Sequence, residues 1–424
     1  KKGDRMARVF SPCVLACLLA AVWCAAASAS DAVTAQRCTA TLTKVADIPT
    51  EGNNGFEAWV EDGGFRLLAA SFWDMNSPNM ASGSWIYNVT SEPGGGLNVA
   101  PLQRLPTVGA TQAHMISPPP GMTGRSMLIV NNFMACGERE EARASTKPCA
   151  PSRVYMQNGP LWEEFRSLKT LGPVKTEHMV VGEGKLWMSF VEAYRDEVSI
   201  WSYNPERHEW HRRFAMHVHA ASDATMMIAE ETLFVTVCSK MHPEGGRASS
   251  CPVFAFMDQN FVQLQNLPSF GASDVDSILF EGTHWLFVAN ERSDSDHRIP
   301  SHLYTFDQTN WKANQTIPTE GARGGHFFVM GGELWLGIAN FGDMLKGKVE
   351  SESNLWKYNR ATHKFDKMAE VDSFGATGWK YFELGGHHYV ALANQGHLTA
   401  KKYQTSYVYR LDEKCEGGGA KGEL

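Results

Sequence analysis

Polar side chains recur at two fixed positions of a repeat that occurs seven times in the chain. Each copy opens at a small residue, and the openings are Gly52, Gly109, Gly172, Ala220, Gly271, Gly321 and Gly375. Five residues past the openings stand Glu57, His114, Glu177, Thr225, Asp276, His326 and Lys380. Three residues past them stand Gly55, Gln112, Lys175, Asp223, Asp274, Gly324 and Gly378. Residues two apart on a strand share one face, so we expect both sets to line one channel, with the residues of the first set as candidate binding residues.

The carboxylates in these sets could bind a cation. Asp223, Asp274 and Asp276, with Glu177 as a further ligand, offer the oxygen atoms that Ca²⁺ prefers. Two other interpretations stay open. The channel wall could be polar simply because water fills it, or the same carboxylates and His326 could catalyse a reaction.

Known catalytic motifs are absent from the sequence. The segment from His208 to His211 is not a HExxH zinc motif, because its second histidine falls one residue early. Gly182 and Gly184 lack the third glycine of a dinucleotide loop and are better explained as a hairpin turn. Neither a GxSxG motif nor a P-loop occurs. We therefore assign no catalytic residue and no required cofactor.

The elements that carry these residues are short strands. After each opening comes an alternating strand, a tight turn, a strongly apolar strand, a variable loop, an aromatic-bearing strand and a last strand. The openings are 48 to 63 residues apart. Four strands per unit at this period predict an all-β, seven-bladed β-propeller over residues 39–415, with four antiparallel strands in each blade.

The ends of the chain are expected to close the ring. The last copy lacks its fourth strand, and residues 39–48 precede the first opening as a fourth strand would. We expect this N-terminal strand to complete the last blade and bring Cys38 beside Cys415. The remaining pairs, Cys136–Cys149 and Cys238–Cys251, would each close one loop between a second and a third strand. Six unpaired thiols are the alternative.

The first residues read as a secretory signal. Residues 1–29 contain a start at Met6, an apolar run over 14–27 and a small-residue cleavage site, so we expect a secreted, disulfide-bonded protein. Residues 416–424 are expected to form a flexible, Gly-rich tail. A membrane anchor is the alternative for the apolar run. The sequons at Asn88 and Asn314 would add glycans on outer strands.

The repeat resembles a known family. The segments GASDVDSILFEGTHWLFVAN, from Gly271, and GARGGHFFVMGGELWLGIAN, from Gly321, each with its following LYTF or LWKY strand, are similar to the epitempin (EPTP), or EAR, repeat. The resemblance implies a seven-bladed propeller that binds proteins outside the cell, as in leucine-rich glioma-inactivated proteins, and an ion in the channel of some members. This chain shows no leucine-rich repeats, so the receptors of those proteins are not carried over.

A non-catalytic, extracellular protein-binding module is the leading functional hypothesis. The net charge is −7 and the sequence has no basic run, so it shows no sign of a positive surface that would bind nucleic acid or an anionic membrane. The loops between second and third strands vary most and are the expected binding surface. A secreted propeller hydrolase or lyase that uses channel carboxylates, and a lectin, are the alternatives. Most aromatic residues recur at core positions, such as Trp187, Trp201, Trp335 and Trp356, which favours packing over sugar stacking.

Overall fold

The structure is a computed structural model and describes residues 38–50, 52–61, 64–72, 83–118, 124–133, 151–182, 184–396 and 405–415. The chain divides into two compact units. One consists of residues 39–413. The other comprises the terminal segments 1–38 and 414–424, within which a disulfide joins Cys38 to Cys415. The expected signal peptide, the Gly-rich tail and the Cys136–Cys149 pair lie outside the described residues.

The unit 39–413 is a seven-bladed β-propeller in which each blade is one four-stranded antiparallel sheet. The first three blades contain β2 (Asn53–Glu61), β3 (Gly64–Ser71), β4 (Gly83–Ser91) and β5 (Leu97–Pro106); β6 (Ala110–Ile116), β7 (Met127–Asn132), β8 (Ser152–Asn158) and β9 (Leu161–Leu168); and β10 (Pro173–Val181), β11 (Lys185–Glu192), β12 (Glu197–Asn204) and β13 (Glu209–His217). The next two contain β14 (Ala221–Ala229), β15 (Thr232–Ser239), β16 (Ala248–Met257) and β17 (Asn260–Phe270); and β18 (Ala272–Phe280), β19 (Thr283–Asn290), β20 (Ser301–Phe306) and β21 (Trp311–Ile317).

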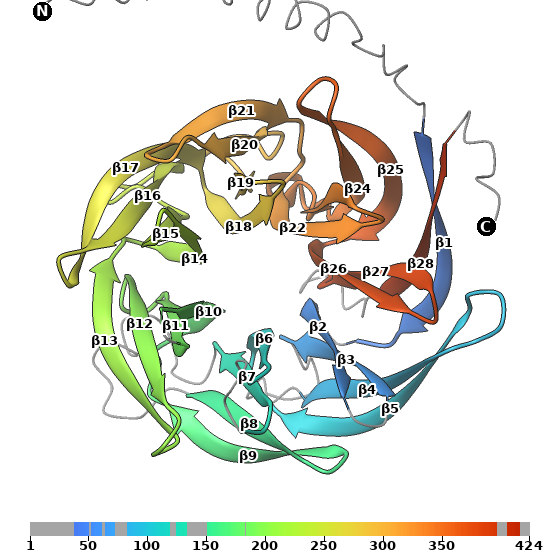
Figure 1. Cartoon of the computed structure of the whole chain (residues 1–424). Coiled ribbons are helices and arrows are strands. Elements are labelled where there is room, and N and C mark those ends of the chain that lie inside the picture. The colour runs from blue at the N-terminus through green and yellow to red at the C-terminus, as the bar shows by residue number, and fades with distance from the viewer. Residues whose placement is uncertain are drawn as a thin grey trace, which may run out of the picture. The chain divides into compact units, whose positions relative to one another are not determined.

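The last two blades confirm the predicted closure of the ring. Blade 6 contains β22 (Ala322–Met330), β23 (Glu333–Asn340), β24 (Glu350–Asn359) and β25 (Lys364–Phe374). Blade 7 contains β26 (Ala376–Leu384), β27 (His387–Asn394) and β28 (Ser406–Cys415), and its fourth strand is β1 (Cys38–Ile48). The N-terminal strand therefore completes the last blade, as Figure 1 shows. A short 3-10 helix, η1 (Met344–Lys346), lies in the loop between β23 and β24.

All seven openings adopt a left-handed backbone, which explains why six of them are glycine. The φ angles are 59° at Gly52, 57° at Gly109, 58° at Gly172, 51° at Gly271, 63° at Gly321, 60° at Gly375 and 49° at Ala220. Glycine reaches this region without a Cβ clash. Each opening carbonyl accepts a backbone N–H from just beyond the second strand of its blade, for example that of Phe72 at Gly52. The opening thus fixes where each innermost strand begins.

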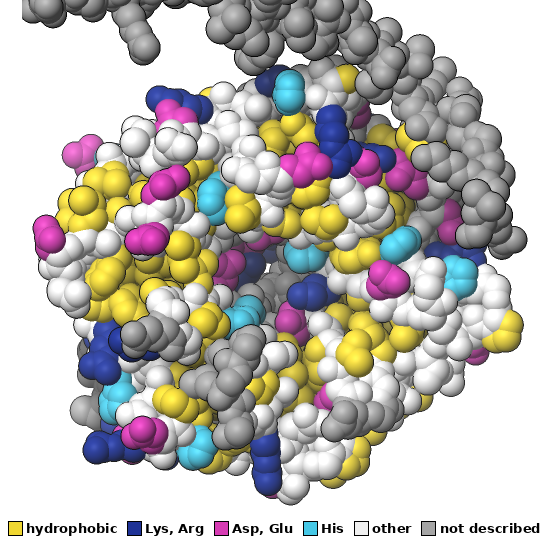
Figure 2. Space-filling view, in the orientation of Figure 1, with side chains coloured by type: hydrophobic (Ala, Val, Ile, Leu, Met, Phe, Trp, Pro, Cys, Tyr) yellow, Lys and Arg dark blue, Asp and Glu magenta, His cyan; other side chains and the backbone are white. Residues whose placement is uncertain are grey.

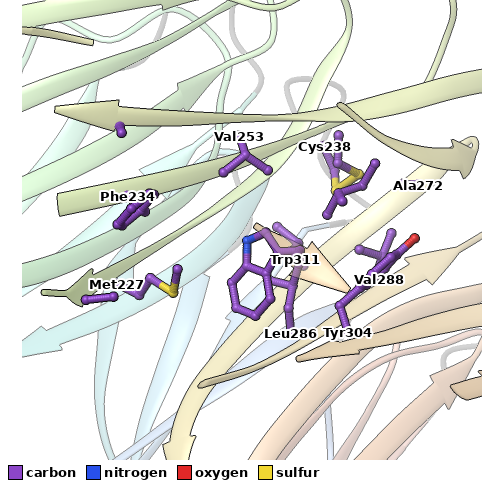
Figure 3. Packing of buried hydrophobic residues seen from close by; sticks show 14 residues of the cluster. Met227, Phe234, Cys238, Val253, Ala272, Leu286, Val288, Tyr304 and Trp311 are labelled. Atoms are coloured by element: carbon purple, nitrogen blue, oxygen red, sulfur yellow. A yellow bond between two sulfur atoms is a disulfide. The ribbon is translucent and has the colours of Figure 1, made fainter. Parts of the chain in front are cut away.

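The core consists of seven hydrophobic clusters, one at each interface between neighbouring blades. In the cluster between blades 4 and 5, Met227 and Phe234 of one sheet pack with Leu286 and Trp311 of the other (Figure 3). The disulfide Cys238–Cys251, which the sequence predicted, lies in the same cluster. Trp335 and Trp201 are buried, and Trp187 and Trp356 pack against clusters. These four tryptophans therefore serve the core.

Candidate functional site

The seven innermost strands surround a central cavity of about 510 Å³. Its wall contains all seven residues at the third position after the openings. It also contains six of the seven at the fifth position: Glu57, His114, Glu177, Asp276, His326 and Lys380. Thr225 is not among the lining residues, and its hydroxyl lies 2.7 Å from that of Ser277. Figure 2 shows charged side chains and histidines inside the central opening.

A β-bulge at the same place in every innermost strand sets this arrangement. In each blade the register shifts between the first and third residues after the opening, for example between Ala221 and Asp223 and between Ala272 and Asp274. A bulge re-aims the side chains that follow it. The third and fifth residues lie after the bulge and keep the same parity, so both sets of side chains face the cavity.

The bulged residue itself was missed by the sequence reasoning. In five blades its side chain donates a hydrogen bond to a backbone carbonyl of the next innermost strand. The bonds run from Asn54 to Thr111, from Thr111 to Pro173, from Ser222 to Ala272, from Ser273 to Ala322 and from Thr377 to Asn53, at 2.6–3.1 Å. The short polar residue two past five of the seven openings was the available signal. These side chains join neighbouring blades.

The channel carboxylates also join blades, because each accepts a backbone N–H from the next innermost strand. Asp223 accepts from Val275 at 3.0 Å and Asp274 from Gly325 at 2.7 Å. Asp276 accepts from Phe327 at 2.7 Å and Glu177 from Met226 at 2.9 Å. A carboxylate that is fixed by backbone donors has fewer free lone pairs for a ligand.

Lys175 occupies the centre of the predicted cation site. Its Nζ lies 2.6 Å from Asp274 Oδ1 and 3.4 Å from Asp223 Oδ2. Burial acts to lower the pKa of Lys175, but the two carboxylates outweigh burial and raise that pKa above its usual value. Among the described residues, no set of three ligand atoms within 4.8 Å of one another includes Asp223, Asp274 or Asp276. These residues do not fit a divalent cation while the ammonium group lies between them.

Elsewhere in the channel the titratable groups interact in pairs. Lys380 Nζ lies 2.9 Å from Glu57 Oε2, and His114 Nε2 lies 2.6 Å from His178 Nδ1. Burial lowers the pKa of His326 to about 3 and lowers that of His114 well below its usual range. Burial, aided by the charge of Asp276, raises the pKa of Glu177 to about 8, and burial raises that of Asp276 to about 7. Burial thus favours the uncharged form of both histidines and of Glu177.

The rim of the cavity at the loop face has an aromatic half and a charged half. Phe133 lies between Phe72 and Tyr194, with ring centroids 6.0 and 5.2 Å away, and these half-buried residues follow the second strands of blades 1 to 3. Across the cavity, Arg323 Nη2 lies 2.9 Å from Glu291 Oε1, and its guanidinium lies 3.5 Å from the centre of the Phe341 ring. Burial acts to raise the pKa of Glu291, but Arg323 and Lys240 outweigh it and lower that pKa to about 2.

The two sequons occupy different strands. Asn314 lies on the outermost strand β21, as expected, whereas Asn88 lies on β4, the third strand of blade 1. The side-chain oxygen of Asn88 accepts a hydrogen bond from Arg66, which also pairs with Glu61 at 2.6 Å. Use of either sequon stays a prediction. Among the described residues, no helix has both the length and the apolar character to cross a bilayer.

Comparison with known proteins agrees with the repeat. The model of the EPTP domain matches residues 364–412, that is, the outermost strand of blade 6 and three strands of blade 7. The human thrombospondin-type laminin G domain and EAR repeat-containing protein is 32% identical over 167 residues, 39% of this chain and 25% of the relative. Its mouse counterpart is 32% identical over 98 residues, 23% of this chain and 15% of the relative. The match thus spans no more than a quarter of these curated relatives.

A solved structure supports the fold alone. A putative 6-phosphogluconolactonase from Bacteroides fragilis aligns with a TM-score of 0.52 over 83% of this chain and 99% of that chain, at 10% identity. At 10% identity, the function of that protein cannot be assigned to this chain. The matched repeat starts with a fourth strand and continues through the next three, which is the same permutation that leaves β1 to complete blade 7. Residues 364–412 of this chain thus match the EPTP repeat, and the chain is similar over part of its length to EAR repeat-containing proteins.

Proposed function

We propose that this propeller is a secreted or cell-surface module that binds another protein through the loop face. The loop face is the side on which loops join second to third strands, and its described loops are 193–196, 240–247, 291–300 and 341–349. The two disulfides fit an oxidising compartment. The related EAR repeat proteins also carry a thrombospondin-type laminin G domain, a combination that favours an extracellular role.

The rim of the cavity is the observation that carries this proposal. Protein interfaces are enriched in aromatic residues and arginine, and their strongest contacts cluster at such groups. Phe72, Phe133 and Arg323 line the cavity, and Tyr194 packs beside Phe133, so the loop face offers both kinds of contact at its centre. An apolar side chain of a partner would pack against the aromatic half, and a polar group would bind to the charged half.

The channel supports an enzyme less well. A catalytic carboxylate must reach a reacting atom, whereas Asp223, Asp274, Asp276 and Glu177 each accept a backbone N–H that joins two blades. The lactonase-like structure shares the fold and no more. We therefore favour the non-catalytic alternative.

The test is a binding screen of the secreted full chain against an array of cell-surface and matrix ectodomains, by surface plasmon resonance. We expect at least one ectodomain to bind with a Kd of about 1 μM or below. The double variant Arg298→Glu with Lys346→Glu changes exposed side chains of the loop face, at 68% and 71% exposure, and should weaken this binding at least tenfold.

The matched control carries the same charge reversals on outermost strands, as Arg213→Glu with Lys312→Glu. It should bind like the parent chain. A screen without any binder, or equal losses in the two double variants, would overturn the proposal.

A further inference from the structure

An exposed aliphatic side chain recurs at one position of the innermost strand in five blades. The position is the eighth residue of a nine-residue strand, and it holds Val60 on β2, Val180 on β10, Ile228 on β14, Leu279 on β18 and Val329 on β22. Their side chains are 77%, 40%, 36%, 58% and 43% exposed, respectively. We call these five residues the apolar annulus.

The annulus surrounds the end of the channel opposite the loop face. Each innermost strand begins at its opening, on the loop side, and ends at the hairpin to its second strand. The innermost strands contact one another around the whole ring. Blades 3 to 6 are consecutive, so four members form a continuous arc. On the face shown in Figure 2, hydrophobic side chains lie on several sides of the central opening.

The fold does not require an aliphatic residue at this position. Blade 7 carries the exposed Glu383 there, and its sheet is complete. The neighbouring residues Trp59, Ala229, Phe280 and Met330 are buried, so the core is filled without the annulus. Exposed apolar side chains that gather on one surface mark interaction sites.

The surroundings of the annulus are acidic. Glu230 and Glu231 follow Ile228 in the hairpin turn, Glu281 follows Leu279, and Glu383 takes the equivalent position in blade 7. Arg360 pairs with Glu281 at 2.7 Å and with Glu333 at 2.5 Å. Within the described part of the chain, Glu230, Glu231 and Glu383 form no ion pair. The basic side chains on this side are Arg360, Lys185 at the blade 3 hairpin and Arg125 in blade 2, so the five glutamates outnumber them.

The negative charge around the annulus distinguishes between the molecules that could bind there. A second copy would bring a like-charged surface against the annulus, and an anionic lipid surface would also be repelled. A segment that presents aliphatic side chains together with Lys or Arg complements both features. We propose that the annulus is a second interaction surface, which binds a basic amphipathic segment of a partner protein.

The probe is a fluorescein-labelled helical peptide of 18 residues built from Leu and Lys, and the reference is the same peptide with Glu in place of Lys. Fluorescence anisotropy with the full chain should show saturable binding of the Leu/Lys peptide. The triple variant Ile228→Thr, Leu279→Thr, Val329→Thr should weaken that binding at least tenfold. Threonine is β-branched and favours strands, so the variant should fold.

The control changes two aliphatics of comparable exposure on the outermost strand β17, as Val262→Thr with Leu264→Thr, at 45% and 46% exposed. It should bind like the parent chain, and Glu230→Gln with Glu231→Gln should reduce both affinity and its salt dependence. Absence of saturable Leu/Lys binding, equal binding by the annulus and control variants, or equal binding of the Leu/Glu peptide would overturn the inference. Self-association of the parent chain that the triple variant abolishes would assign the annulus to a second copy instead.

Discussion

The ammonium nitrogen of Lys175 lies 2.6 Å from Asp274 Oδ1, across 99 residues of sequence and from one innermost strand to another. Both Asp274 and its neighbour Asp223 have side chains only 3% exposed, whereas that of Lys175 is 33% exposed. The positive charge beside the Asp274 carboxylate and the Asp223 carboxyl group is therefore supplied by the protein itself.

Replacement of Lys175 should create a need for a cation. Lys175→Met leaves buried carboxylates without a counter-charge, and the loss of one partner of a buried pair typically costs about 3–5 kcal/mol. We expect the parent chain to melt at the same temperature in calcium and in EDTA, and the variant to melt lower, with part of the loss recovered in millimolar calcium. Scanning calorimetry measures all four conditions. A calcium-dependent melting temperature of the parent chain would contradict this assignment.

The sevenfold ring was predictable because its signals are local and repeated. A left-handed residue at each opening selects glycine, so the openings can be aligned, and residues such as Glu57 and Asp276 can be placed on the channel wall from their offsets. The missing fourth strand of the last copy likewise pointed to residues 39–48.

The pairings across the channel could not be predicted in the same way. The contacts of Lys175 with Asp274 and of His114 with His178 depend on which blades face each other and on side-chain reach, which no offset encodes. The bulge that re-aims these side chains is likewise not visible in the sequence. The apolar annulus could have been predicted from the sequence. Once the openings are aligned, the position eight residues past them holds residues such as Val60 and Leu279.

Replacement of the one non-glycine opening by glycine should raise the stability of the propeller. Ala220 has a φ of 49°, a conformation that costs an L-residue about 1–2 kcal/mol, of which the extra freedom of glycine in the unfolded chain offsets about 0.5–1 kcal/mol. Ala220→Gly should therefore stabilise the propeller by up to about 1.5 kcal/mol in urea unfolding. The matched change Gly271→Ala should destabilise it, because the added Cβ would lie 2.8 Å from the Arg292 carbonyl oxygen. Equal signs for the two changes would refute this account.

The buried carboxyl of Glu177 should make stability fall as the pH rises. Its pKa is raised to about 8 in the folded chain, from 4.5 for the unperturbed group. The folded state therefore binds more protons between these values, and the free energy of unfolding decreases across this window. Glu177→Gln replaces the carboxyl by a neutral group of similar shape and should flatten the slope between pH 5 and 9.

Urea unfolding at intervals of pH gives this slope directly. Near pH 4.5, where Glu177 is protonated in the folded chain, the variant should differ little from the parent, and the benefit of the variant should grow towards pH 9. An unchanged slope would show that Glu177 does not hold its proton at neutral pH.

The two disulfides should differ in their contribution to stability. A cross-link lowers the entropy of the unfolded chain more when it closes a longer loop, in the chain-entropy model. Cys38–Cys415 spans 377 residues and Cys238–Cys251 spans 13. We expect Cys38→Ala with Cys415→Ala to cost about 5 kcal/mol and Cys238→Ala with Cys251→Ala about 3 kcal/mol in urea unfolding. Because Cys238 and Cys251 are fully buried, the alanine variant of this pair also loses core packing, which adds to the cost of the lost cross-link. A smaller cost for the terminal pair than for the loop pair would mean that the ends of the chain stay together without their covalent bond.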